Sequence, residues 1–201
     1  SINWMDEHIP AIINAWYPGE SGGKAVAEVL FGDYNPGGRL PLTYYRSLDE
    51  LPPFDDYDIT KGRTYQYFKG NVLYPFGYGL SYTRFEYGEP TADKECIAPD
   101  ETLRVAVTVT NMDDYDGEET VQLYIRDVQS RITRPEMELR RFKKIFLKKG
   151  ATETVVFELA LPDLEYVLSD GSRVYDPGEF EVFTGGSSDR VKALRFVLTD
   201  R

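Results

Sequence analysis

The sequence predicts a mixed fold, in which the last part of an α/β sandwich domain is followed by an all-β sandwich. Residues 1–84 are rich in Gly and Pro and contain one helical pattern, whereas residues 85–201 alternate apolar and polar side chains repeatedly. A chain of 201 residues is long enough for one large domain or two small ones. We therefore expect an α/β segment with a long linker loop over residues 1–84 and a β-sandwich over residues 85–201.

The first half predicts the short elements of an α/β layer. The apolar run Ala11–Tyr17 predicts a buried strand, and residues 22–31 carry apolar side chains at helical spacing. Ser21 can cap this helix and Gly32 can end it, before Leu40–Tyr44 resumes extended chain. A single strand–helix–strand unit cannot cover both faces of a parallel sheet, so we interpret this half as the end of a larger α/β domain.

The long connection over residues 45–84 contains the strongest binding candidate. A loop of this length is usually functional or packed onto another part of the protein. Within it, Tyr65 and Tyr67 would lie on one side of an extended segment, next to Arg63. Aromatic faces stack on sugar rings, and Arg donates to hydroxyl or carboxylate oxygens. Arg63, Tyr65 and Tyr67 are therefore the predicted substrate-binding residues, with a strand that merely anchors the loop as the equal alternative.

The second half predicts strands in series. Five stretches alternate apolar and polar residues with a period of two, at residues 103–109, 121–125, 155–159, 180–182 and 194–198. Turn signals such as Asp116-Gly117 and Asp170-Gly171 separate them. Short strands divided by turns, without a helical period, indicate an antiparallel β-sandwich.

Composition excludes several kinds of partner and site. The formal net charge of −11 argues against a nucleic-acid partner, because an acidic chain repels phosphate backbones. No stretch approaches the roughly 20 apolar residues of a membrane span, so we expect no membrane partner. The single histidine, His8, excludes a zinc site with two imidazoles, and the single cysteine, Cys96, excludes an internal disulfide. We expect no metal and no cofactor.

One motif resembles a catalytic nucleophile. Gly19–Gly23 fits the pattern Gly-x-Ser-x-Gly, which places a reactive serine on a strand-to-helix turn in α/β-hydrolases. Those enzymes need a histidine base after the serine in the chain, but His8 precedes Ser21. We therefore predict that Ser21 is a helix cap.

Two acidic clusters are interpreted as solvated loops. Placing Gly117 at the sixth position of a calcium loop puts Met112 first and Leu123 twelfth, and neither side chain is a calcium ligand. We predict a solvated hairpin loop there. The second cluster, in the long connection, has no obvious shell to raise a carboxyl pKa, so we predict a solvated acidic loop. Its members are Asp49, Glu50, Asp55, Asp56 and Asp58.

Residues 126–149 contain nine basic and three acidic side chains. We interpret this segment as a polar strand face and loop that pair with the acidic remainder of the protein, with a polyanion-binding patch as the alternative. Trp4 and Trp16 are expected in a core or a domain contact, and Cys96 is expected to be an unreactive thiol.

Longer motifs resemble one enzyme family. Trp16–Gly23 and Ala27–Pro41 resemble the second domain of glycoside hydrolase family 3, and Tyr74–Thr83 resembles the segment that leaves that domain. Glu119–Ile125 and Leu139–Lys144 resemble the fibronectin type III-like domain at the C-terminus of the same family. The resemblance therefore spans nearly the whole chain in order.

This resemblance implies the C-terminal portion of a retaining β-glucosidase or β-xylosidase acting on terminal β-linked glucose or xylose. Family members also carry an N-terminal (β/α)8 barrel with the nucleophilic aspartate, and an acid/base glutamate earlier in the sandwich domain. We therefore expect no catalytic residue in this chain, a structural role for it, and the barrel and sandwich domain as its partners. The compartment of such a parent enzyme stays open.

Two other interpretations remain. The chain could be an autonomous carbohydrate- or partner-binding module, for which an aromatic platform of Tyr115, Tyr166 and Tyr175 is the candidate surface. It could also be a separately expressed scaffold that assembles with a catalytic chain.

Overall fold

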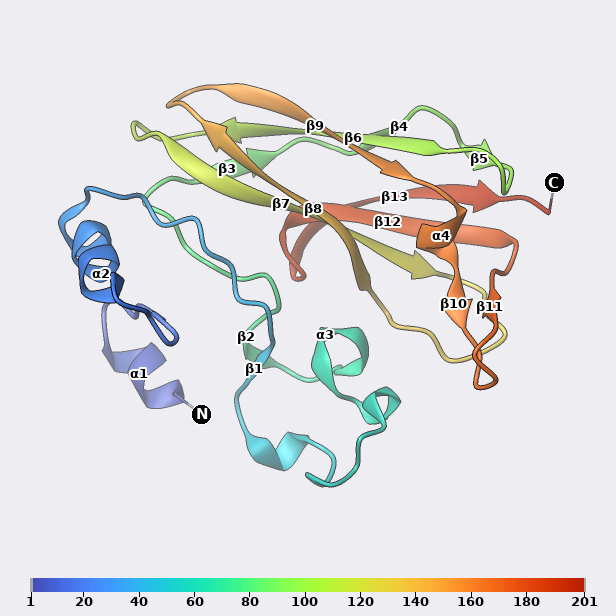
Figure 1. Cartoon of the computed structure of the whole chain (residues 1–201), viewed down its shortest axis with the longest axis horizontal. Helices are drawn as coiled ribbons and strands as arrows, with labels where there is room; N and C mark the ends of the chain where they lie inside the picture. The colour runs from blue at the N-terminus through green and yellow to red at the C-terminus, as the bar shows by residue number, and fades with distance from the viewer. Residues whose placement is uncertain (1, 201) are drawn as a thin grey trace.

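The computed structural model describes residues 2–200 and places a β-sandwich beside a set of short N-terminal elements. In Figure 1 the sandwich lies across the top of the view, and the blue and cyan N-terminal segments lie below it and to its left. The predicted mixed fold is thus confirmed. Within residues 2–200, no helix has the length and apolar character needed to cross a membrane.

The larger sheet of the sandwich has five strands in the order β5-β13-β12-β7-β8. All neighbours in this sheet are antiparallel except β13 and β5, which are parallel. A β-bulge interrupts the β7–β8 pairing between Leu123 and Tyr124, so the register shifts at the start of β8 and the end of β7. The strands are β5 (Cys96–Ile97), β7 (Gly117–Asp127), β8 (Glu138–Leu147), β12 (Gly178–Ser187) and β13 (Arg190–Leu198).

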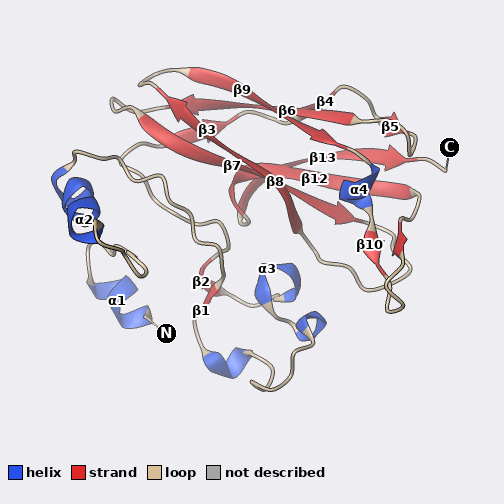
Figure 2. Ribbon diagram, in the orientation of Figure 1, coloured by secondary structure: helices blue, strands red, loops and turns tan. Residues whose placement is uncertain are grey.

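The second sheet is built around β6 (Leu103–Asn111), which pairs with β9 (Thr152–Leu159) along its length. The short strands β3 (Phe85–Tyr87) and β4 (Thr91–Ala92) pair with β6 as well. Figure 2 shows the two sheets as stacked red layers. A one-turn helix α4 (Leu161–Leu164) and the hairpin of β10 (Tyr166–Val167) and β11 (Arg173–Val174) follow β9.

The hydrophobic core lies between these two sheets. Along β6, buried and exposed residues alternate, as a period of two requires of a strand with one face on the core. The Phe180 and Phe196 rings stack at 5.5 Å across β12 and β13. Each fully buried side chain of this size stabilises the fold by roughly 1.5–3 kcal/mol. The predicted alternating stretches therefore do form the sandwich and bury its centre.

The N-terminal part has no comparable core. It contains α1 (Asn3–His8) and α2 (Gly22–Phe31), and β1 (Tyr44–Tyr45) pairs with β2 (Val72–Tyr74). Between β1 and β2 lie the 3-10 helices η1 (Leu48–Glu50) and η2 (Ile59–Lys61) and the single turn α3 (Thr64–Tyr67). Among the described residues before Leu73, no hydrophobic side chain is buried.

The helix prediction for residues 22–31 is confirmed, and Gly32 ends α2 in the left-handed conformation with φ at +83°. Ser21 occupies the N-cap position without a side-chain capping hydrogen bond.

The predicted strand Ala11–Tyr17 is wrong. This segment is exposed and irregular, and Trp16 adopts a positive φ of +51°, which a strand does not allow. No strand of residues 2–200 pairs with it, so its backbone has no ladder to join. Trp4 and Trp16 are also exposed, which excludes the predicted core role within the described residues.

Candidate functional site

The loop between β1 and β2, residues 46–71, carries the predicted binding residues and is ordered by its own caps. The Ser47 hydroxyl accepts from the Asp49 amide at 3.1 Å at the start of η1. The Asp58 carboxylate accepts from the Thr60 amide at 3.0 Å at the start of η2. Gly62, with φ at +94°, ends η2 and turns the chain toward Arg63.

The Arg63 side chain bonds to the backbone of an earlier part of the same loop. Its Nη2 donates to the carbonyl oxygens of Pro53 at 2.6 Å and Pro52 at 3.2 Å. Its Nε is buried and has no hydrogen-bond partner among the described residues. The Nη2 group therefore holds the loop together, while the buried Nε donor remains unused.

The predicted extended segment around Tyr65 is wrong, because Thr64–Tyr67 forms one helical turn. Thr64 starts the turn with φ at +59°, and its amide donates to the Tyr45 hydroxyl at 2.6 Å. Residues two apart on a helix point roughly 200° away from each other. Tyr65 and Tyr67 therefore face different directions instead of sharing one side.

Tyr65 points toward the sandwich. Its ring stacks on Phe76 at 4.2 Å and meets Tyr124 of β7 edge-on at 5.9 Å. Its hydroxyl accepts from the Leu139 amide of β8 at 3.0 Å. Burial raises the pKa of the Tyr65 hydroxyl, although the Leu139 hydrogen bond acts in the opposite direction. These contacts occupy one face and the polar end of the ring.

Tyr67 is half-buried on the other side of the turn. Burial raises the pKa of its hydroxyl, and the nearby Arg134 charge partly offsets this. No aromatic ring is found stacked on Tyr67 among the described residues. Of the two predicted tyrosines, only Tyr65 therefore has an aromatic ring stacked on it among the described residues.

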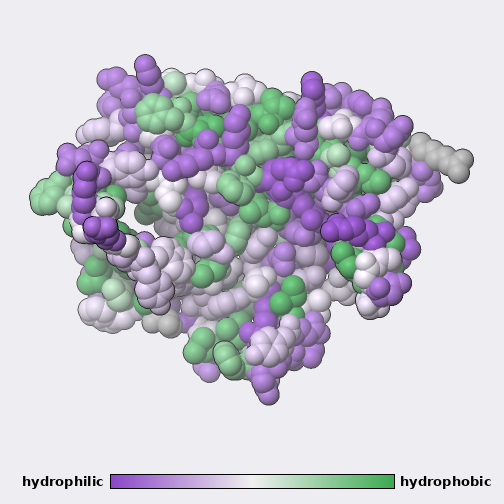
Figure 3. All heavy atoms as spheres, in the orientation of Figure 1, coloured by the Kyte–Doolittle hydropathy of each residue, from purple (hydrophilic) through white to green (hydrophobic). Residues whose placement is uncertain are grey.

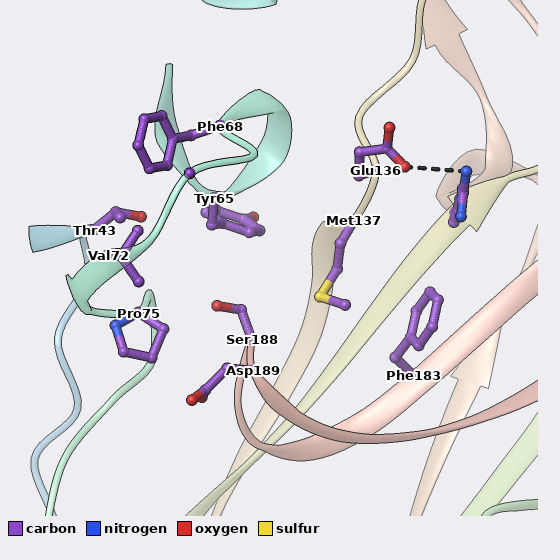
Figure 4. A pocket seen from close by; sticks show the side chains of 12 residues that line it. Thr43, Tyr65, Phe68, Val72, Pro75, Glu136, Met137, Phe183, Ser188 and Asp189 are labelled. Carbon is purple, nitrogen blue, oxygen red and sulfur yellow. Dashed lines mark ion pairs between the residues drawn. The ribbon is translucent and has the colours of Figure 1, made fainter. Parts of the chain in front are cut away.

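A groove of about 350 Å³ lies between part of the loop and the sandwich. Figure 4 shows Tyr65 and Phe68 on the loop side, with Met137 and Phe183 opposite them on the sandwich side. Arg126 and Glu136 also line the groove and form an ion pair with N and O atoms 3.0 Å apart, drawn as the dashed line in Figure 4. Of the three predicted binding residues, only Tyr65 lines this groove.

Sequence reasoning missed the sandwich side of this groove. Met137 lies just before β8, Phe183 lies on β12, and the turn between β12 and β13 contributes Ser188 and Asp189. These residues lie far from the loop in the sequence, and no local pattern connects them to it. The aromatic run Tyr74–Tyr78 was the one available signal, since it supplies Phe76 beneath Tyr65.

Most of the acidic residues lie as predicted for solvated loops, but that prediction is wrong for Glu119, which is buried on β7. Asp56 pairs with Lys61 at 2.7 Å, and this hydrogen bond lowers the pKa of the Asp56 carboxyl. Asp113 pairs with Arg84 at 2.9 Å on the sandwich surface. Across residues 2–200, no group of three or more His, Cys, Asp or Glu side chains is arranged to hold a metal ion.

His8 and Ser21 lie in different local surroundings. The His8 ring stacks on Trp4 at 4.7 Å, and its Nδ1 lies 2.8 Å from the Trp4 carbonyl oxygen. Ser21 follows an irregular segment where a nucleophile turn would need a strand. The structure therefore offers no strand-to-helix nucleophile turn at Ser21.

The proposed aromatic platform of the binding-module interpretation does not form. Tyr166 is buried beneath the Arg134 guanidinium, which lies 4.6 Å from the ring centre, and its hydroxyl donates to Asp176. Tyr175 packs against the core, and Tyr115 is exposed. The three rings therefore do not offer one common exposed face.

The basic segment 126–149 pairs within the chain. Lys144 contacts Glu118 at 2.6 Å, and Arg140 contacts Glu138 at 3.0 Å. Arg141 pairs with the buried carboxylate of Asp163. Such internal partners support the prediction of a polar strand face over that of a polyanion patch.

Comparison with known families agrees with the two-part organisation. The model of the glycosyl hydrolase family 3 C-terminal domain matches residues 1–82, and that of the fibronectin type III-like domain matches residues 119–188. The chain is therefore related to the β-xylosidases and β-glucosidases of glycosyl hydrolase family 3. It carries a C-terminal region of that family, and the resemblance predicted from the motifs is confirmed. The proposed boundary after residue 84 stays a prediction, because residues 83–118 lie between the two matches.

Individual family members are similar over almost the whole chain. A xylan 1,4-β-xylosidase of Xylanibacter ruminicola is 45% identical over 90% of this chain and 21% of its own length. A periplasmic β-glucosidase of Salmonella typhimurium is 37% identical over 96% of this chain and 27% of its own length. The structure of a β-glucosidase from Erythrobacter marinus superposes with a TM-score of 0.87 at 41% identity, covering 97% of this chain and 26% of that one. The chain thus spans about a quarter of the length of the relatives it matches.

Proposed function

We propose that this chain is the C-terminal part of a retaining glycosidase that hydrolyses terminal β-linked glucose or xylose, and that it braces the catalytic domains. The similarity to β-xylosidases and β-glucosidases over about a quarter of their length supports this proposal. Retention of configuration needs two carboxyl groups about 5–5.5 Å apart. In this proposal both carboxyl groups come from the preceding barrel and sandwich domain, and this chain alone is inactive.

The observation that carries the proposal is the exposed apolar surface of the N-terminal segments. Trp4, Trp16 and Phe31 are 64%, 51% and 84% exposed. Figure 3 shows hydrophobic residues at the surface along the left edge of the view, where Figure 1 places α2. A surface helix normally turns its apolar side chains toward a core, so these residues fit an interface with further protein. The barrel and the rest of the sandwich domain are the proposed occupants.

The loop of residues 46–71 is proposed to border the substrate site. Among the described residues, the buried Arg63 Nε has no hydrogen-bond partner, and no aromatic ring stacks on Tyr67. A guanidinium donor and an aromatic face are the groups that sugar hydroxyls and rings recognise. Tyr65 takes part differently, because its contacts with Phe76 and Leu139 hold the turn against the sandwich.

A chimera tests the proposal. The matching quarter of the Erythrobacter marinus β-glucosidase is replaced by this chain, and hydrolysis of nitrophenyl β-glucoside and β-xyloside is measured for the chimera and for this chain alone. We expect turnover by the chimera and none above background by the isolated chain.

Turnover by the isolated chain would overturn the placement of the catalytic pair. A folded but inactive chimera would overturn the bracing role. Glycan-array binding by the isolated chain, together with an inactive chimera, would favour the binding-module interpretation.

A further inference from the structure

We propose that β7 and the segments 34–40 and 74–83 form one buried polar junction, which makes the β-sandwich inseparable in folding from the N-terminal part of the chain. The junction would define the folding unit of the chain whichever sugar a parent enzyme cleaves. The polar junction consists of Arg39, Gly77 and the half-buried Asn35 from these segments, Glu119 and Gln122 from β7, and Tyr87 from β3.

A buried ion pair joins the two parts. Arg39 Nη2 pairs with Glu119 Oε2 on β7, and these side chains are 10% and 3% exposed. The Tyr87 hydroxyl donates to Glu119 Oε1 at 2.6 Å. Burial raises the pKa of the Glu119 carboxyl, while Arg39 and Tyr87 act in the opposite direction. The charge of a strand residue is therefore neutralised by a residue 80 positions earlier.

A buried amide makes the second connection. Gln122 Nε2 donates to the Gly77 carbonyl at 3.3 Å and to the Gly186 carbonyl at 2.5 Å. Gln122 Oε1 accepts from the Tyr124 hydroxyl at 2.5 Å. Gly77 has φ at +80°, and a Cβ atom on it would overlap the Gln122 amide. Only glycine satisfies both the backbone conformation and this close approach.

Asn35 connects both N-terminal segments to the sandwich. Its Nδ2 donates to Thr83 Oγ1 and to the Asp116 carbonyl, each at 2.9 Å. Its Oδ1 accepts from Ser81 Oγ at 2.6 Å and from the Tyr82 amide at 2.8 Å. The side-chain amide thus uses its donors and its acceptor across three stretches of chain.

These contacts distinguish the junction from an ordinary domain contact. Contacts between domains of one chain resemble transient, solvated interfaces. Here, loss of segments 34–40 and 74–83 would remove the cationic partner of Glu119 and the Gly77 carbonyl bound by Gln122 at the same time. A buried carboxylate that loses its cationic partner is strongly destabilising, whereas Gln122 would keep the Gly186 carbonyl and the Tyr124 hydroxyl. The partner that fits this face of β7 is therefore the chain's own N-terminal part.

Hydrogen exchange of the full chain, followed by mass spectrometry of peptides, tests the proposal. Gly77→Ala should accelerate exchange by at least about tenfold in residues 34–42, 74–83 and 117–127 together. The matched control is Gly150→Ala, which also replaces a glycine of positive φ, at +69°, but has open space around the new Cβ. It should leave those three peptides unchanged. Acceleration in residues 34–42 and 74–83 with unchanged exchange in 117–127 would overturn the proposal.

Charge variants give an independent measurement. Arg39→Met should lower Tm by roughly 10 °C, and adding Glu119→Gln should recover part of that loss, because the buried carboxylate is then removed. The control Arg84→Ala breaks an ion pair whose Arg side chain is 82% exposed, and should shift Tm by no more than about 2 °C.

Equal shifts for Arg39→Met and Arg84→Ala would contradict the junction. If Gly77→Ala yields no folded protein, exchange is measured on Arg39→Lys, which keeps the charge but loses the forked donor. Accelerated exchange in all three peptides would again support the proposal, and unchanged exchange in residues 117–127 alone would overturn it.

Discussion

The hydroxyl of Tyr65 accepts a 3.0 Å hydrogen bond from the backbone amide of Leu139, across the boundary between the loop and the sandwich. A second hydrogen bond crosses the same boundary, because the carbonyl of Gln66, the residue after Tyr65, accepts from the Glu136 amide at 2.9 Å. The edge of the sandwich near β8 thus holds the turn that carries the predicted binding residues. A domain without expected catalytic groups could in this way affect the geometry of a substrate site.

The first prediction concerns this anchor. Tyr65→Phe should reduce the free energy of unfolding by about 1 kcal/mol, because the Leu139 amide loses its acceptor. Tyr65→Ala should cost about 2–3 kcal/mol, because the ring packed on Phe76 is also lost. Urea unfolding measures both, with Tyr57→Ala as a control on an exposed ring of the same loop. Equal stability of Tyr65→Phe and Tyr65→Ala would show that the ring contributes nothing.

The second prediction concerns substrate contact. In the active chimera, Arg63→Ala and Tyr67→Ala should each raise KM several-fold, since one removes a donor and the other an aromatic face. Initial rates on nitrophenyl β-glucoside measure this. Arg195→Ala, on the distant strand β13, serves as the control. Unchanged KM and kcat for both loop variants would reject the role of these residues at the substrate site.

The third prediction concerns the proposed interface. Phe31→Glu should change the stability of the isolated chain by less than about 0.5 kcal/mol, because this side chain is largely exposed. In the chimera the same substitution should strongly reduce activity and Tm, because a charge would be buried against the other domains. Tyr115→Glu, on an exposed turn of the sandwich, should affect neither. A fully active and stable Phe31→Glu chimera would contradict the interface.

The fourth prediction concerns acid stability. Burial opposes ionisation of Asp176, but the hydrogen bonds from Arg131 and Tyr166 outweigh it and lower its pKa from 3.8 to about 2. The folded state therefore binds this proton less readily than the unfolded state. The resulting stabilisation is complete above pH 3.8 and is lost as the pH falls toward 2.

Asp176→Asn should accordingly cost about 1.5–3 kcal/mol at pH 7, and the difference from the parent should shrink toward pH 2. Thermal unfolding between pH 2 and pH 7 measures this difference. Asp100→Asn, which changes an exposed carboxylate, is the control. A cost that stays constant over this range would exclude the ionised carboxylate as its source.

Local patterns predicted the elements whose neighbours are close in the sequence or whose faces repeat regularly. The alternation in Leu103–Val109 predicted β6, and Gly32 predicted the end of α2. The prediction of a strand at Ala11–Tyr17 was wrong, because an apolar run becomes a strand only where a neighbouring strand supplies hydrogen bonds. The helical turn at Thr64–Tyr67 was missed as well, because it depends on the Tyr45 hydroxyl, 19 residues before Thr64.

The sequence by itself determined the fold class, the family and the residue types available for sugar contact, because each depends on composition, on periodicity or on motifs read within a few residues. Only the tertiary structure decided that Tyr65 stacks on Phe76 and accepts from the Leu139 amide, and that Arg39 pairs with Glu119. Those contacts depend on how distant segments approach one another and exclude water. That approach is a property of the packed chain as a whole, which no local pattern encodes.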